Sequence, residues 1–99
     1  MKNTLTCIVR FLAKEGKVTE LTNQFEQLLS LVREKESGCV KSSLLSNKNN
    51  SQEVCLMLNF TNYEEYRKHF TTDYLKEFVE NHVPNLVEKI DQELYSPIQ

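Results

Sequence analysis

The spacing of apolar residues changes several times along this chain, and the order of those changes leaves few folds open. Residues 4–13 are rich in β-branched and aromatic side chains, as is typical of a strand. After a break at residues 14–17, apolar side chains recur at helical spacing, at Val18, Leu21, Phe25, Leu28, Leu29 and Val32. We therefore expect a strand, a turn and a long amphipathic helix in this part of the chain.

The segment after this helix has the pattern of a turn followed by a hairpin. Residues 33–36 are all charged, which predicts a solvent-exposed last turn. Gly38 lies where glycine often ends a helix, because glycine adopts a positive φ without steric cost. Residues 39–46 form a weaker strand candidate, residues 47–51 a polar turn, and residues 53–60 a strong strand candidate. The two strands should pair as a hairpin with a rather long loop.

A second helical region begins at Thr61. Thr61 and Glu64 have the spacing of a capping box, in which each side chain bonds an amide of the first turn. A break is expected near residues 71–73, where Thr72 or Asp73 could cap a new helix that Pro84 limits. One face of the first piece holds Tyr63, Tyr66 and Phe70, and one face of the second holds Leu75, Phe78 and Val79.

The last segment, from Leu86 to Ile98, favours a strand near residues 87–95, with a short helix as the alternative. The order of elements is then βαββαβ, with the second helix broken in two. That order favours an α+β, ferredoxin-like fold with an antiparallel sheet and helices packed on one face. A length of 99 residues predicts one domain, residues 1–99.

The expected strands carry apolar side chains on both faces. One face of residues 54–60 would hold Val54, Leu56, Leu58 and Phe60, and the opposite face Cys55 and Met57. Leaving such a face in water costs roughly 1.5–3 kcal/mol for each large side chain. A second copy of the chain stacked sheet to sheet would remove that cost, so the sequence predicts a homodimer.

Charge and cysteine content argue against several classes of protein. The chain has 12 Lys and Arg against 14 Asp and Glu, and nucleic acid as a main partner would require a concentrated positive surface. No run of about 18 apolar residues exists, so no membrane span is expected. The odd set Cys7, Cys39 and Cys55 lacks paired spacing, which favours reduced thiols in a cytoplasmic protein over zinc ligands or a disulfide framework.

Short motifs spread over much of the chain together point to a known family. Ser37-Gly38-Cys39 leads into the second strand, Phe60 ends the third, and His69 lies on the following helix ahead of residues 72–75 and Phe78. With this spacing the chain resembles, roughly from Leu5 to Phe78, the antibiotic biosynthesis monooxygenase family. These are dimeric α/β-barrel proteins that include quinol monooxygenases.

Some positions depart from the family pattern. Leu58 replaces a family Glu, Phe60 a family Trp, and Tyr74 the second His of the pattern. The Trp and His of haem-degrading relatives are not supplied here, so the resemblance does not imply haem degradation. Enzymatic members often act without metal or flavin and oxidise a phenol or hydroquinone with dioxygen. The resemblance therefore implies no cofactor and a small-molecule pocket between sheet and helices in each subunit.

His69 is the candidate catalytic residue. An imidazole titrates near neutral pH, so it can take the proton of a phenol and make the ring a better electron donor to dioxygen. The alternative is a histidine that caps the end of a surface helix. Phe60, Tyr66 and Tyr74 are candidate substrate-binding residues, because aromatic rings offer flat contact area and hydroxyls orient a ligand. The alternative for them is ordinary core packing.

Two polar residues within the apolar strands complete the candidate substrate-binding set. Asn59 could bond a ligand or a cross-strand partner, and Arg10 could pair with a ligand oxyanion or extend into solvent at a strand end. Two functions follow. One is a cofactor-independent monooxygenase that oxidises a small aromatic or quinol-like compound with dioxygen, which the family resemblance favours. The other is a non-catalytic dimeric small-ligand-binding or stress-related protein of the same fold, which Leu58 and Phe60 favour.

Overall fold

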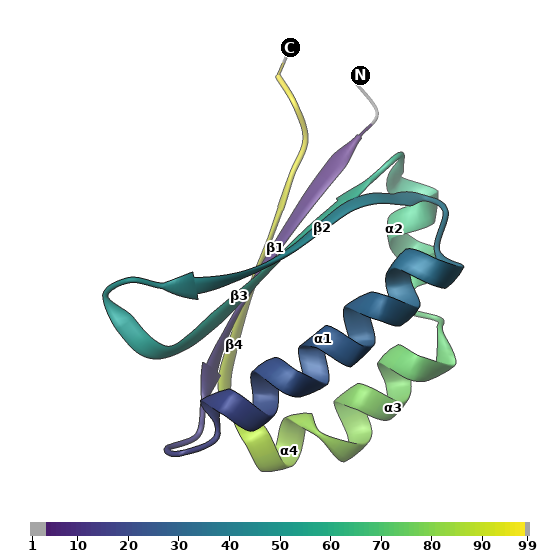
Figure 1. The fold of residues 1–99 in the computed structure, drawn as a ribbon. Helices are drawn as coiled ribbons and strands as arrows, with labels where there is room; N and C mark the ends of the chain where they lie inside the picture. Colours follow the sequence, from purple (N-terminus) through teal and green to yellow (C-terminus); the bar gives the residue numbers. More distant parts are fainter. Residues whose placement is uncertain (1–3, 99) are drawn as a thin grey trace.

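The computed structural model describes residues 4–98. Its elements are, in order, β1 (Leu5–Ala13), α1 (Val18–Lys35), β2 (Cys39–Asn47), β3 (Asn50–Phe60), α2 (Tyr63–His69), α3 (Asp73–Asn81), α4 (Val83–Leu86) and β4 (Val87–Tyr95). The strands form one antiparallel sheet in the order β2-β3-β1-β4. All helices lie on one face of that sheet (Figure 1). The ferredoxin-like α+β arrangement is confirmed, including the broken second helix.

Strand pairing settles two segments that the sequence left open or misplaced. β4 is a strand, so the alternative of a short helix at the chain's end is wrong. Asn47 pairs with Asn50, so the expected long hairpin loop is wrong and the turn is tight. The side chain of Asn47 accepts a hydrogen bond from the Asn49 amide at 2.8 Å, which lets a polar segment close a short turn.

Helix ends are set by neighbours that local spacing did not reveal. The cap of α2 is Asn62, whose Oδ1 accepts from the Glu65 amide at 2.9 Å, so the capping box at Thr61 is wrong by one residue. Gly38 does not have a positive φ; among residues 4–98 only Gly16 does, at 75°. A Cβ at Gly38 would lie 2.6 Å from the Cβ of Glu65, so close approach of α2 explains this glycine.

The core lies between the helices and the face of the sheet that they cover. The buried residues of α1 are Leu21, Phe25, Leu28, Leu29 and Val32, and those of β3 are Val54, Leu56, Leu58 and Phe60. The Phe25 ring lies 4.7 Å from the Phe11 ring and 5.0 Å from the Phe78 ring, measured between centroids. The apolar stripe of the long helix therefore packs as its spacing predicts.

Among residues 4–98 no helix covers the opposite face of the sheet, which carries partly exposed side chains (Figure 1). Leu45, for example, keeps 42% of its surface exposed. Cys7 is buried under the helices and Cys55 lies on the open face; these two and Cys39 are free thiols. The homodimer stays a prediction. Within residues 4–98 no helix is both long and apolar enough to cross a membrane.

Candidate functional site

An apolar cavity of about 170 Å³ lies between the sheet and the helices. Side chains from β1, β3, β4 and the helices α1, α2, α3 and α4 line it. Of the lining side chains in the described part of the chain, only His69 and Gln92 carry nitrogen or oxygen. A ligand in this space would thus meet hydrocarbon on most sides and two polar groups.

His69 is the last residue of α2 and is 5% exposed. Its Nδ1 lies 2.9 Å and 3.1 Å from the two carboxylate oxygens of Glu36, so Nδ1–H donates to that carboxylate. The imidazole also packs against the rings of Phe60 and Phe70, with centroids 5.5 Å and 5.2 Å away. Within residues 4–98 the ring's hydrogen bonds all run through Nδ1. Nε2 is therefore the nitrogen available to a ligand, and His69 is not a surface cap.

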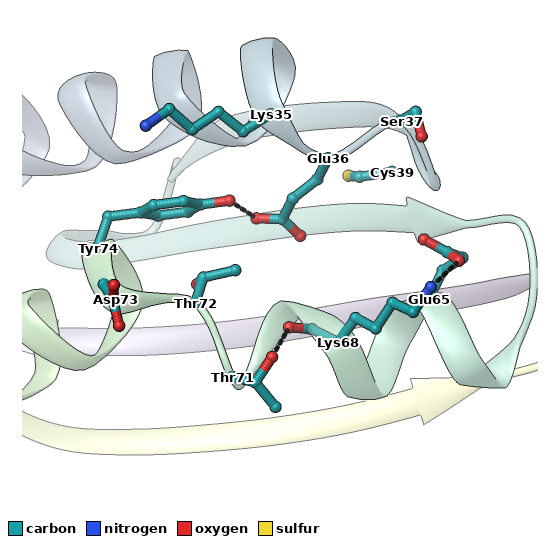
Figure 2. A pocket seen from close by; sticks show the side chains of 10 residues that line it. All are labelled: Lys35, Glu36, Ser37, Cys39, Glu65, Lys68, Thr71, Thr72, Asp73 and Tyr74. Carbon is teal, nitrogen blue, oxygen red and sulfur yellow. Dashed lines mark hydrogen bonds and ion pairs between the residues drawn. The ribbon is translucent and has the colours of Figure 1, made fainter.

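Glu36 is the residue that the sequence analysis missed. The prediction of a solvated last turn is wrong for it, because its side chain is only 11% exposed. The helix ends here, with φ −113° and ψ 87°, and the side chain turns toward the junction of α2 and α3. There it also accepts a hydrogen bond from the Tyr74 hydroxyl at 2.5 Å (Figure 2). The acidic residue just before Ser37-Gly38-Cys39 was the available signal.

The Tyr74 hydroxyl donates to the Glu36 carboxylate, whose side chain is only 11% exposed. Burial raises the pKa of Tyr74, and the hydrogen bond to the Glu36 carboxylate raises it further, because both disfavour a second negative charge. Glu36 thus holds two donors, one on each side. This fixes the orientation of the imidazole at the cavity.

Glu36 also lines a polar groove of about 590 Å³ (Figure 2). Lys35, Lys68, Cys39 and Tyr74 help to line it. The groove is larger than the cavity but open to solvent. Burial raises the pKa of the Cys39 thiol and the Glu36 charge raises it further, so Cys39 is not an activated nucleophile. We take the cavity, where His69 faces apolar surface, as the candidate active site.

Phe60 and Tyr66 lie behind the cavity rather than along it. The Tyr66 ring packs edge-on against Phe60 with centroids 5.7 Å apart. The Tyr66 hydroxyl accepts a hydrogen bond from Nε2 of Gln92 at 2.8 Å. Phe60 therefore supports His69, and Tyr66 supports Gln92. Gln92 lines the cavity and, like Glu36, was not predicted from the sequence.

Arg10 and Asn59 lie on the open face of the sheet, away from His69. Arg10 pairs with Glu93, and Asn59 accepts a hydrogen bond from the Thr6 hydroxyl at 2.8 Å. Successive strand residues point to opposite faces, so Asn59 faces away from the helices while its neighbour Phe60 faces toward them. The structure brings Phe60, Tyr66 and Tyr74 around His69 but leaves Arg10 and Asn59 apart.

Comparison with known proteins finds one matching family and several similar solved structures. The antibiotic biosynthesis monooxygenase family matches residues 4–81. A Shewanella oneidensis protein of solved structure is 25% identical with a TM-score of 0.92, over 98% of this chain and 93% of that one. A Pseudomonas aeruginosa protein is 18% identical with a TM-score of 0.89, over 100% and 98% of the two chains.

A third solved structure has a stated activity. SnoaB from Streptomyces nogalater, a cofactor-independent oxygenase, is 16% identical with a TM-score of 0.82, over 98% of this chain and 95% of its own. At this identity the likeness shows the fold alone. No curated protein matches the sequence.

Proposed function

The chain belongs to the antibiotic biosynthesis monooxygenase family, and we propose that it is a cofactor-independent monooxygenase acting on a small aromatic, hydroquinone-like compound with dioxygen. One observation carries the proposal. A buried imidazole is held through Nδ1 by the Glu36 carboxylate, and its ring lines an apolar cavity. A histidine held in this way, with its second nitrogen open to a ligand, is arranged as a general base.

His69 performs the proton transfer in this proposal. Its Nε2 takes the proton of a substrate hydroxyl, and the Glu36 carboxylate stabilises the imidazolium that forms. The resulting phenolate is an electron-rich donor to dioxygen. The apolar walls exclude water from the reacting ring, which limits side reactions of reduced oxygen. Glu36 is a positioning residue for His69, and Tyr74 holds Glu36 in place. Phe60 supports His69, and Tyr66 supports Gln92.

The proposed reaction balances without an external reductant. One oxygen atom of dioxygen forms a new carbon–oxygen bond on the ring, and the other leaves as water. The hydroquinone gives up all four electrons and becomes a hydroxyquinone. The proton held by His69 ends in the water that is formed. The substrate itself therefore supplies the electrons that a flavin or a metal centre would otherwise deliver.

The test is incorporation of isotopically labelled oxygen gas into a hydroquinone, followed by mass spectrometry. We expect one labelled atom in the product, and a loss of about 10²–10⁴-fold in rate for His69→Ala. His82→Ala is the matched control, because His82 is the other histidine, its ring centroid lies 5.8 Å from that of Phe78, and it does not line the cavity. An unchanged rate in His69→Ala would remove this residue from the mechanism.

The second candidate function is a non-catalytic dimeric small-ligand-binding or stress-related protein. Leu58 favours it, because this residue replaces the family's Glu, lines the cavity and is 3% exposed. Phe60 in place of the family's Trp favours it too. Saturable binding of hydroquinones without labelled product would select this function over the oxygenase.

We also propose that the chain, as a single domain, forms a cytoplasmic homodimer through the open face of its sheet. Ile8, Leu12 and Met57 point to this face and remain only partly buried. A second copy would cover them at a gain proportional to the apolar area removed from water. Light scattering should give about twice 11.6 kDa, and a monomer at micromolar concentration would contradict the proposal.

A further inference from the structure

The cavity reaches the surface through a rim of three exposed apolar side chains. Phe70, Val79 and Ile90 all line the cavity, yet they keep 43%, 50% and 45% of their surface exposed. They come from three places in the fold: the end of α2, the last turn of α3 and the edge strand β4. We call these three residues the apolar rim.

The size of the cavity limits what can lie inside the rim. A volume of about 170 Å³ is close to the roughly 150 Å³ of an engineered apolar cavity that binds benzene. One aromatic ring with a hydroxyl fills this space. Any larger substituent on that ring must pass the rim and lie against it.

The polarity of the cavity orients the ring. His69 and Gln92 are the only lining side chains with nitrogen or oxygen in the described chain, so the hydroxyl belongs near them. Nε2 of Gln92 already donates to Tyr66, which holds that amide in place. A ring carbon remote from the hydroxyl then faces apolar surface, continuous with the rim. A charged substituent there would lose its hydration without a partner.

We infer that the ligand of this site is a single phenolic ring with an apolar alkyl-type tail, the ring in the cavity and the tail on the apolar rim. The inference rests on the proposed site at His69, but not on turnover. Val79 and Ile90 then determine specificity, since they contact the tail rather than the reacting ring. The rim also explains why large apolar side chains stay exposed beside a buried histidine.

Binding of a para-alkylphenol series tests the inference without requiring oxidation. Isothermal titration calorimetry would compare phenol with its ethyl, butyl and hexyl derivatives. We expect the dissociation constant to fall about two- to fourfold for each added methylene until the rim is covered, because a fully buried methylene is worth about fourfold. Equal affinity along the series, or weaker binding with longer tails, would overturn the inference.

Variants of the rim residues test whether the alkyl tail lies on the apolar rim. Val79→Glu should weaken hexylphenol binding about tenfold or more and change phenol binding little, and Ile90→Gln should act in the same direction. Val40→Glu is the matched control, because Val40 is 62% exposed on β2 and does not line the cavity. Loss of hexylphenol binding in Val40→Glu as well would show that the tail does not use the rim.

The outcomes separate this inference from the proposed activity. Tail-dependent binding without labelled oxygen in any hydroquinone would keep the rim and reject the oxygenase. His69-dependent oxidation with equal affinity for all tails would keep the oxygenase and reject the rim.

Discussion

Two carboxylates in this protein each bind a basic side chain and a tyrosine, on opposite faces of the same sheet. Under the helices, Glu36 accepts from Nδ1 of His69 and from the Tyr74 hydroxyl. On the open face, Glu93 pairs with Arg10 and accepts from the Tyr95 hydroxyl at 2.8 Å. The chemistry of the two trios is similar, so their differences come from their surroundings.

Burial is the main difference. The side chains of Glu36 and His69 are 11% and 6% exposed, whereas those of Glu93 and Arg10 are 43% and 39% exposed. Burial is the largest cause of the raised pKa of Tyr74, but the hydrogen bond to Glu93 is the largest cause of the raised pKa of Tyr95. Water screens the open trio, and salt weakens it further. Only the covered trio combines a fixed geometry with a low dielectric.

Of the substitutions that test this comparison, Glu36→Gln is expected to have the largest effect. The variant keeps the shape of the side chain but removes the charge that stabilises an imidazolium at His69. We expect the labelled-oxygen rate to fall about hundredfold or more. The free energy of unfolding in urea should fall by roughly 1.5–3 kcal/mol, the range for hydrogen bonds to charged groups. A normal rate with reduced stability would make Glu36 purely structural.

An intermediate effect is expected from Tyr74→Phe. Loss of one partly buried hydrogen bond to a carboxylate should cost about 1–2 kcal/mol of unfolding free energy at neutral pH. The pKa of Tyr74 is raised in the folded state, so this contribution is complete below the unfolded pKa of about 10. It is lost as pH rises above that value, because only the unfolded tyrosine ionises readily.

The urea midpoints of wild type and Tyr74→Phe should therefore stay apart up to about pH 10 and converge as the pH rises above that value. Tyr95→Phe is the matched control on the open face. When its hydroxyl is removed, water can solvate the Glu93 carboxylate instead. A gap for Tyr74→Phe that widened with pH would contradict the sign of the linkage.

The smallest effect is expected from Glu93→Gln. The hydrogen bond from Arg10 is the main cause of the lowered pKa of Glu93, but both side chains remain exposed to water. We expect no measurable change in the urea midpoint at dilute protein concentration. A loss of stability that grew with protein concentration would show that the proposed homodimer buries this pair, and would limit the comparison of the two trios to the single chain.

Much of the fold follows from local pattern. Val87–Tyr95 is the strand expected near residues 87–95, and the helix from Val18 has the expected buried stripe. Such predictions succeed because periodicity, β-branching and proline act over a few neighbouring residues. His69 was identifiable as a candidate because its side chain chemistry and its place in the family motif are both visible in one dimension.

The partners of His69 were not visible in this way. Glu36 lies 33 positions away in a run of charged residues, and local pattern alone places all of that run in solvent. Gly38 resembled a helix-ending glycine, but the close approach of Glu65 from α2 explains it. Arg10 and Asn59 resembled site residues until strand alternation was combined with the face that the helices cover.

The order of elements, the apolar stripes and the presence of a histidine suited to proton transfer can be read from the sequence alone. These properties depend on side chain type and on spacing along the backbone. Tertiary packing selects which of two similar carboxylates is enclosed and which side chains open a cavity to the surface. Burial depends on packing between distant segments, and burial separates the covered trio around His69 from its exposed counterpart at Arg10.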